Sequence, residues 1–112
     1  MATTKVIGDK GEQRAVDFLI SKGYEIVQRN YRYKRAEVDI VVSKDKWLVF
    51  IEVKLRKNNR YGQPETFVSD KKIGLVHQAA TIYIEDNRWK GHLRFDIISI
   101  CGDEILHLED AF

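Results

Sequence analysis

The chain has 112 residues, of which 44% are hydrophobic, 11% aromatic and 32% charged, with a formal net charge of +2. This length gives a single domain, residues 1–112, with a core of its own, and the composition excludes a wholly disordered chain. The longest apolar run, residues 48–51, is far shorter than the ~20 residues of a membrane helix, and the N-terminal residues lack a signal-peptide stretch. The single cysteine allows no internal disulfide. We expect a cytoplasmic protein without a membrane partner.

The charge is unevenly distributed along the chain. Residues 29–60 contain ten basic and four acidic side chains, a formal charge of +6, whereas the last twelve residues carry −4. A basic segment of this kind favours a polyanionic partner such as nucleic acid. Charges scattered over a solvated surface explain the same pattern, so both interpretations stay open at this point.

The hydrophobic pattern predicts a helix at residues 10–22, with Asp9 as its N-cap and Gly23 just beyond its end. Strands follow at 24–31, 36–43 and 47–56, and the short turn between the last two predicts an antiparallel hairpin. After a polar loop at 57–67, a second helix over 69–86 begins at Ser69, and strands at 93–100 and 104–108 end the chain. The order α-β-β-β-α-β-β predicts an α/β fold with a mixed central sheet flanked by helices.

Two charged residues interrupt the most apolar strand, 47–56. Glu52 and Lys54 lie two positions apart, so strand alternation places both side chains on one face of the sheet. An acid-x-Lys pair carries little information alone, because chance supplies about one in a chain of this composition. Its position matters more, since charged groups in a core strand are costly unless they are paired, hydrogen-bonded or bound to a metal.

The hairpin register decides which other acids join this pair. A loop of two or four residues sets Asp39 opposite Phe50 and Glu37 opposite Glu52, whereas a three-residue loop moves one strand's side chains to the other face. With an even loop, one face carries four charged groups: Glu37, Asp39, Glu52 and Lys54.

Three carboxylates at such spacings, about 5 to 8 Å, repel one another, and a divalent cation resolves the repulsion. Mg²⁺ (or Mn²⁺) suits the arrangement because it binds one or two carboxylates together with waters and phosphate oxygens. We therefore predict a metal site at Asp39, Glu52 and Glu37. Lys54 would orient or help to deprotonate a metal-bound water, or balance charge in the transition state.

Glu12 is a fourth acid of interest. It lies in the apolar stripe of the first helix, so its side chain is expected to point toward the sheet. Alternatively, it is a first-turn glutamate favoured by the helix dipole. The residues alone leave these interpretations equal.

The order of Asp39, Glu52 and Lys54 resembles the Asp…(Asp/Glu)-x-Lys signature of the restriction-endonuclease-like, or PD-(D/E)xK, superfamily. From about residue 8 to 100 the chain resembles the YraN-like family of small predicted endonucleases. The matching segments, in family order, are Gly11-Glu12, Gly23-Tyr24, Arg29-Asn30-Tyr31-Arg32, Ala36-Glu37-Val38-Asp39-Ile40, Phe50-Ile51-Glu52-Val53-Lys54-Leu55-Arg56, Tyr61-Gly62-Gln63-Pro64, Lys72 and Arg94-Phe95-Asp96.

The resemblance implies a restriction-endonuclease-like core similar to that of archaeal Holliday-junction resolvases. It also implies a catalytic set in which Glu12 of the first helix joins Asp39, Glu52 and Lys54, and, by analogy with paired resolvases, a homodimer. The chain departs from the family pattern at Ala36, where the family usually has Gly, and from the superfamily pattern at Val38, which replaces Pro. Neither departure removes an acid from the set.

Basic residues around this hairpin are candidates for phosphate contacts. We predict nucleic-acid contacts from Arg29, Arg32, Lys34, Arg35, Arg56, Lys57, Arg60 and Lys72. Tyr31 and Tyr33 either stack on exposed bases or belong to a half-buried strand. Because no helix-turn-helix or zinc-finger pattern is present, recognition by shape or branching is expected rather than by base sequence.

The leading hypothesis from the sequence is a Mg²⁺-dependent endonuclease that hydrolyses phosphodiester bonds in DNA, including branched or otherwise structured DNA. A nucleic-acid-binding module of the same fold without turnover is the alternative. A protein-interaction domain that uses the basic face is a third hypothesis.

Overall fold

The computed structural model describes residues 4–56 and 68–112, with side chains from residue 10 onward. Within these ranges the elements are α1 (Thr4–Ser21), β1 (Glu25–Tyr33), β2 (Ala36–Lys44), β3 (Trp47–Arg56), α2 (Asp70–Asn87), β4 (His92–Cys101) and β5 (Glu104–Leu108). The predicted order of elements is confirmed, although α1 begins six residues earlier than expected. The predicted loop at 57–67 lies outside the described residues. No helix in the described part of the chain is long and apolar enough to cross a bilayer.

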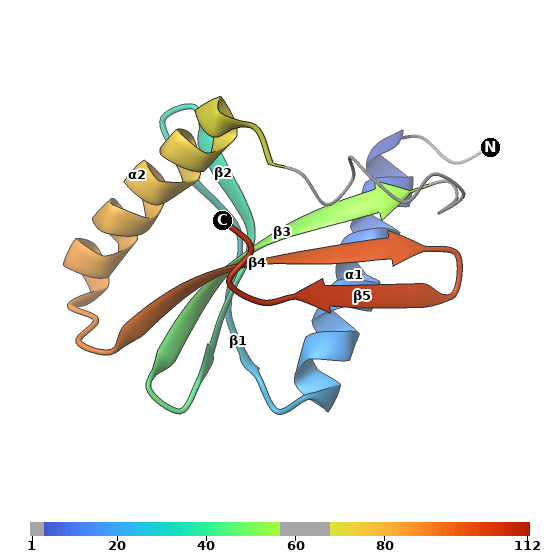
Figure 1. Ribbon diagram of the computed structural model, residues 1–112, viewed down its shortest axis with the longest axis horizontal. Coiled ribbons are helices and arrows are strands. Elements are labelled where there is room, and N and C mark those ends of the chain that lie inside the picture. The colour runs from blue at the N-terminus through green and yellow to red at the C-terminus, as the bar shows by residue number, and fades with distance from the viewer. Residues whose placement is uncertain (1–3, 57–67) are drawn as a thin grey trace.

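The strands form one mixed sheet in the order β1-β2-β3-β4-β5. Strands β3 and β4 are parallel, and the other neighbouring pairs are antiparallel. The helices lie on opposite faces of the sheet: α1 packs against β1, β3 and β4, and α2 packs against β1 and β2 (Figure 1). The structure therefore confirms an α/β fold in which a mixed sheet is flanked by helices.

The end of α1 and the start of α2 follow the signals in the sequence, whereas the predicted N-cap Asp9 was wrong, because it lies inside α1. Ser69 caps α2, since its hydroxyl accepts a hydrogen bond from the Lys72 N–H at 3.2 Å. After α1, Gly23 has φ = +92°, a conformation that glycine adopts without steric cost, and the Tyr24 N–H returns to the Leu19 carbonyl at 3.0 Å. These caps fix where β1 and α2 start.

The β2–β3 hairpin has a register that differs from the prediction. Lys44 pairs with Trp47 and Ile40 pairs with Ile51, so the loop contains only two residues. Asp45, the first residue of this loop, has φ = 55°, and a positive φ at that position is typical of two-residue hairpin turns. The predicted pairing of Glu37 with Glu52 was wrong by two residues, because β2 continues through Lys44 before it turns. Continued along the strands, the observed register places Asp39 beside Glu52.

Strand β2 also breaks its alternation near Asp39. Val38 and Val41 pack in the core on the α2 face, while Ile40 and Val42 pack in the core on the α1 face. Regular alternation would put Val38 and Ile40 on the same face. The last β2–β3 pair described in the sheet is that of Ile40, so β2 changes its course where Asp39 lies.

Candidate functional site

Asp39 is held at this break by the backbone of β3. Its Oδ2 accepts a hydrogen bond from the Val53 N–H at 2.8 Å. The carboxylate thus occupies the place of a strand partner just beyond the paired part of the hairpin. This contact fixes one oxygen of Asp39 next to Glu52.

Glu52 is a buried carboxylate with unequal oxygens. The residue is 6% exposed, and its Oε1 lies 3.2 Å from Lys72 Nζ of α2 and 3.8 Å from Lys54 Nζ of β3. Its Oε2 is buried and has no hydrogen-bond partner among the described residues. A buried acceptor left in this state costs about 1–3 kcal/mol, and more when it is charged. Such an oxygen is suited to an additional ligand.

The electrostatics of Asp39 lead to the same conclusion. Burial, followed by the charge of Glu52, raises the pKa of Asp39 from 3.8 to about 7. The Val53 N–H and Lys72 oppose this rise, and the charge of Glu12 adds to it. These two opposing contacts therefore do not offset the burial of Asp39 and its repulsion by Glu52.

Glu12 points from α1 toward the sheet, as expected from its place in the helix. Its side chain is only 12% exposed, and its Oε1 accepts hydrogen bonds from Arg29 Nε at 3.2 Å and Asn30 Nδ2 at 3.1 Å. The preceding Gly11 packs against Leu55 of β3, whose methyl carbon a Cβ at that position would meet. Glu12 is thus close enough to act on Asp39 electrostatically while bound to β1.

Glu37 does not join the other acids. Its Oε2 lies 3.1 Å from Arg32 Nη2, across the β1–β2 pair. The neighbouring Ala36 and Val38 pack against α2, so alternation directs Glu37 to the opposite side of the sheet from Glu52. The predicted common face of Glu37 and Glu52 was therefore wrong, because the break near Asp39 reverses the alternation. Within residues 4–56 and 68–112 no group of three or more His, Cys, Asp or Glu is arranged to hold a metal ion.

The basic residues lie in several places around the sheet. Arg32, Lys34 and Arg35 are exposed at the β1–β2 turn, and Arg29 is engaged with Glu12. Arg56 ends β3 and Lys72 lies in the first turn of α2, while the predicted contacts Lys57 and Arg60 lie outside the described residues. Tyr31 packs edge-on against Tyr83 of α2, with ring centroids 5.1 Å apart, as expected for a half-buried strand.

The sequence did not reveal the ion pair between Lys72 and Glu52. These residues are far apart in the chain, and only the packing of α2 on the sheet brings them together. In the sequence, the position of Lys72 in the first turn of the second helix indicates a phosphate contact. It does not indicate an ion pair with Glu52.

The fold and site together define a class of protein. It is a small α/β protein with a helix on each face of a five-stranded mixed sheet. In the described part of the chain, the buried carboxyl of Glu52 lies next to the half-buried carboxyl of Asp39 and beside two lysines. The chain belongs to uncharacterised protein family UPF0102, whose sequence model matches residues 11–100. This confirms the resemblance to the YraN-like family, and the matched segment contains Glu12, Asp39, Glu52, Lys54 and Lys72.

Relatives match over nearly their whole length. A UPF0102 protein of Cytophaga hutchinsonii is 43% identical over 105 residues, which cover 93% of this chain and 93% of the relative. One from Christiangramia forsetii is 41% identical over 116 aligned positions, covering 100% and 98%. One from Sulfurihydrogenibium is 40% identical over 102 residues, covering 90% and 89%. These relatives support the family assignment.

Proposed function

We propose that the protein is a metal-dependent endonuclease with a restriction-endonuclease-like core, which hydrolyses phosphodiester bonds in DNA, including branched or otherwise structured DNA. The observation that supports this most strongly is the adjacent pair of half-buried Asp39 and buried Glu52, with Glu52 Oε2 lacking a hydrogen-bond partner among the described residues. Structural carboxylates in a core are normally fully bonded. A pair that is not fully bonded favours binding of a cation.

The donor set fits Mg²⁺ or Mn²⁺. These ions take oxygen ligands, retain several waters and bind through one or two carboxylates and the phosphates of the substrate. Asp39 and Glu52 supply such carboxylates, whereas Glu37 lies elsewhere. When bound, the metal would supply an acidified water and neutralise charge on the phosphate.

The side chains around this pair would have distinct tasks. The Val53 N–H holds the Asp39 carboxylate in place. Lys54, 3.8 Å from Glu52, would orient the attacking water or stabilise charge that develops on the phosphate. Glu12 would orient metal-bound waters from the α1 side.

The basic residues would bind the nucleic-acid backbone. The exposed cations of the β1–β2 turn, together with Arg56 and Lys72, would contact phosphates, so binding would weaken as salt rises. We also propose that the protein acts in the cytoplasm and pairs as a homodimer, which would present two sites for two strands. Sedimentation with and without DNA would test the dimer.

Cleavage assays test the enzymatic proposal. Linear, nicked and four-way-junction DNA are incubated with Mg²⁺, with Mn²⁺ or with a chelator, using the wild type, Glu52→Gln and the matched control Glu25→Gln, an exposed strand residue. We expect cleavage that requires the metal, is lost in Glu52→Gln and is retained in the control. Absence of metal-dependent cleavage of any substrate, or equal cleavage by Glu52→Gln, would overturn the proposal.

A binding module without turnover is the alternative, and one observation favours it. Lys72 and Lys54 both lie near Glu52 Oε1, so part of the acidic charge is already balanced without a metal. Salt-sensitive DNA binding without cleavage would establish this alternative. If neither binding nor cleavage is found, the protein-interaction hypothesis gains support.

A further inference from the structure

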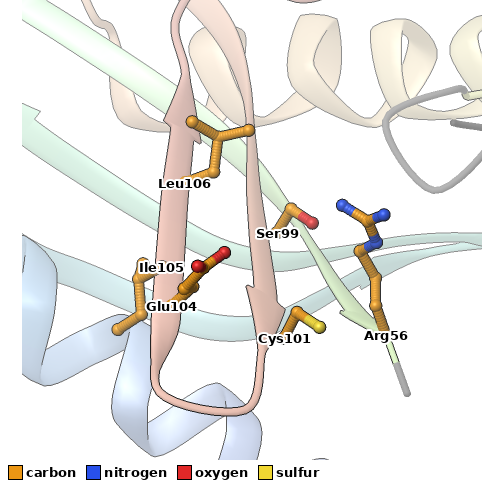
Figure 2. A pocket seen from close by; sticks show the side chains of 6 residues that line it. All are labelled: Arg56, Ser99, Cys101, Glu104, Ile105 and Leu106. Carbon is orange, nitrogen blue, oxygen red and sulfur yellow. The ribbon is translucent and has the colours of Figure 1, made fainter. Parts of the chain in front are cut away.

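A hollow of about 320 Å³ lies on the sheet beside the candidate site. It is lined by Arg56 of β3, Ser99 and Cys101 of β4, and Glu104, Ile105 and Leu106 of the following hairpin strand (Figure 2). In Figure 2 the Ser99 hydroxyl and the Cys101 sulfur point toward the side on which Arg56 lies. The hollow lies on the same face of the sheet as α2, because Ser99 alternates with Ile98 and Ile100, which pack in the core on the α1 face. It is at the β4–β5 edge, whereas α2 covers β1 and β2 (Figure 1).

The hollow is continuous with the proposed catalytic strand. In the parallel β3–β4 pair, Lys54 is the partner of Ser99 and Arg56 is the partner of Cys101. Paired residues project to the same face, and side chains two positions apart on a strand are about 7 Å apart. A group bound in the hollow would therefore lie close to Lys54, because Ser99 is the direct partner of Lys54 on the neighbouring strand.

The lining combines three kinds of surface. Ser99, a residue that is 3% exposed, contributes its hydroxyl to the lining, and Glu104 contributes a carboxylate. Leu106 is an apolar residue that is 49% exposed, and Arg56 adds a planar cation. Nucleobases outside a duplex are bound by this combination: guanidinium or apolar contact on the ring face and hydrogen bonds at the ring edge.

The volume of the hollow and its position beside the candidate site limit which ligand it can hold. A volume of about 320 Å³ is at the small end of ligand pockets, so it suits one base rather than several. A paired base is stacked inside the duplex and cannot enter a side pocket without being unpaired. We propose that the hollow receives one unpaired nucleobase next to the phosphate that is cut. The substrate class is then DNA with unpaired nucleotides, whether single-stranded or at a branch. This inference rests on the proposed nuclease function.

The only cysteine of the chain provides a direct test. The measured quantity is the rate at which a maleimide alkylates Cys101 in the wild-type protein. Ca²⁺ replaces Mg²⁺ so that the DNA is not cleaved, and a gel verifies that the DNA stays intact. The probes are a single-stranded DNA oligonucleotide, an abasic oligonucleotide of equal length and a blunt duplex, each at a concentration shown by anisotropy to saturate the protein. Only the first can place a base over the thiol.

We expect the single strand to slow alkylation about tenfold, in line with the energy of base contacts in single-strand binding, and the other probes to slow it less than about twofold. Equal protection by the abasic strand, or none by any bound probe, would overturn the base pocket and leave the nuclease proposal standing. Failure of every probe to bind would overturn both.

A matched pair of variants gives a second measurement. Leu106→Ala removes the apolar wall of the hollow, and Leu93→Ala removes a similarly exposed leucine, 39% exposed, at the far end of β4. We expect Leu106→Ala to weaken single-strand binding about fivefold without changing binding of the abasic strand, and Leu93→Ala to leave both unchanged. Equal effects of the two substitutions would contradict the proposal.

Discussion

Two carboxyl regions of this protein, Asp96 and the Asp39–Glu52 pair, differ sharply in how many hydrogen bonds their oxygens receive. Asp96 is 0% exposed and receives two hydrogen bonds from Arg94 at 2.9 Å, one from His107 Nε2 at 2.7 Å and one from the Asp110 N–H at 3.0 Å. By contrast, the buried Oε2 of Glu52 has no hydrogen-bond partner among the described residues.

The pKa values follow this difference. Burial alone would raise the pKa of Asp96, but the hydrogen bonds from His107 and Arg94 hold it below the ordinary value of 3.8. Burial and Glu52 raise the pKa of Asp39 to about 7. The Asp96 network stabilises the fold by joining β4 to β5 and the C-terminal residues. The raised pKa of Asp39 means that its ionised form is less favourable in the folded protein, which is typical of functional sites that retain unfavourable charge.

The largest expected effect on stability is at Asp96. Asp96→Asn removes the charge that balances Arg94 inside the network, and breaking a buried ion pair costs about 3–5 kcal/mol. We expect the free energy of unfolding, measured by urea denaturation, to fall by that amount. A loss below about 1 kcal/mol would show that the network does not stabilise the fold as the contacts indicate.

Asp39→Asn is expected to act in the opposite direction. In the folded protein the pKa of Asp39 is raised, so between about pH 4 and pH 7 the folded state binds a proton that the unfolded state has released. The free energy of unfolding therefore decreases as pH rises through this window, and the variant lacks that decrease. In chelator at pH 8 we expect Asp39→Asn to be more stable by about 2 kcal/mol, with little difference at pH 4.

The Asp39→Asn experiment needs a control variant and has a second readout, cleavage. The exposed Asp17→Asn serves as control and should change stability by less than about 0.5 kcal/mol at either pH. Asp39→Asn should also lose metal-dependent cleavage, if the proposed function holds. A variant that is destabilised at pH 8 would show that the carboxylate is better satisfied than its contacts indicate.

Lys72→Met is expected to have an intermediate effect, about a tenfold loss of cleavage, because one cation near Glu52 and the substrate phosphate disappears. Its side chain is 37% exposed, so stability should change by no more than about 1 kcal/mol. The neighbouring exposed Lys71→Met is the matched control. Single-turnover rates and thermal unfolding of the two variants measure both effects, and equal rates would remove Lys72 from the site.

The sequence predicted well those features that depend on local signals. Hydrophobic periodicity predicted the order of the elements, and the caps at Ser69 and Gly23 were located from single residues. The hairpin register was wrong because the two-residue turn lies at residues 45–46, one position later than predicted, and the length of a loop alone does not fix its position. The reversal of alternation near Asp39 was not predictable, since period-two reasoning assumes a regular strand.

This reversal makes Glu37→Gln the most informative of the small-effect variants. The sequence alone placed Glu37 among the metal ligands, whereas the structure pairs it with Arg32 on the other side of β2. Its side chain is 36% exposed, so loss of the ion pair should reduce stability by less than about 1 kcal/mol. We expect Mn²⁺ affinity, measured by calorimetry, and cleavage to stay within about twofold of the wild type, against a large loss for Glu52→Gln. A large loss of metal affinity in Glu37→Gln would mean that β2 is regular at Asp39 when metal is bound, with the acids on one face as strict alternation requires.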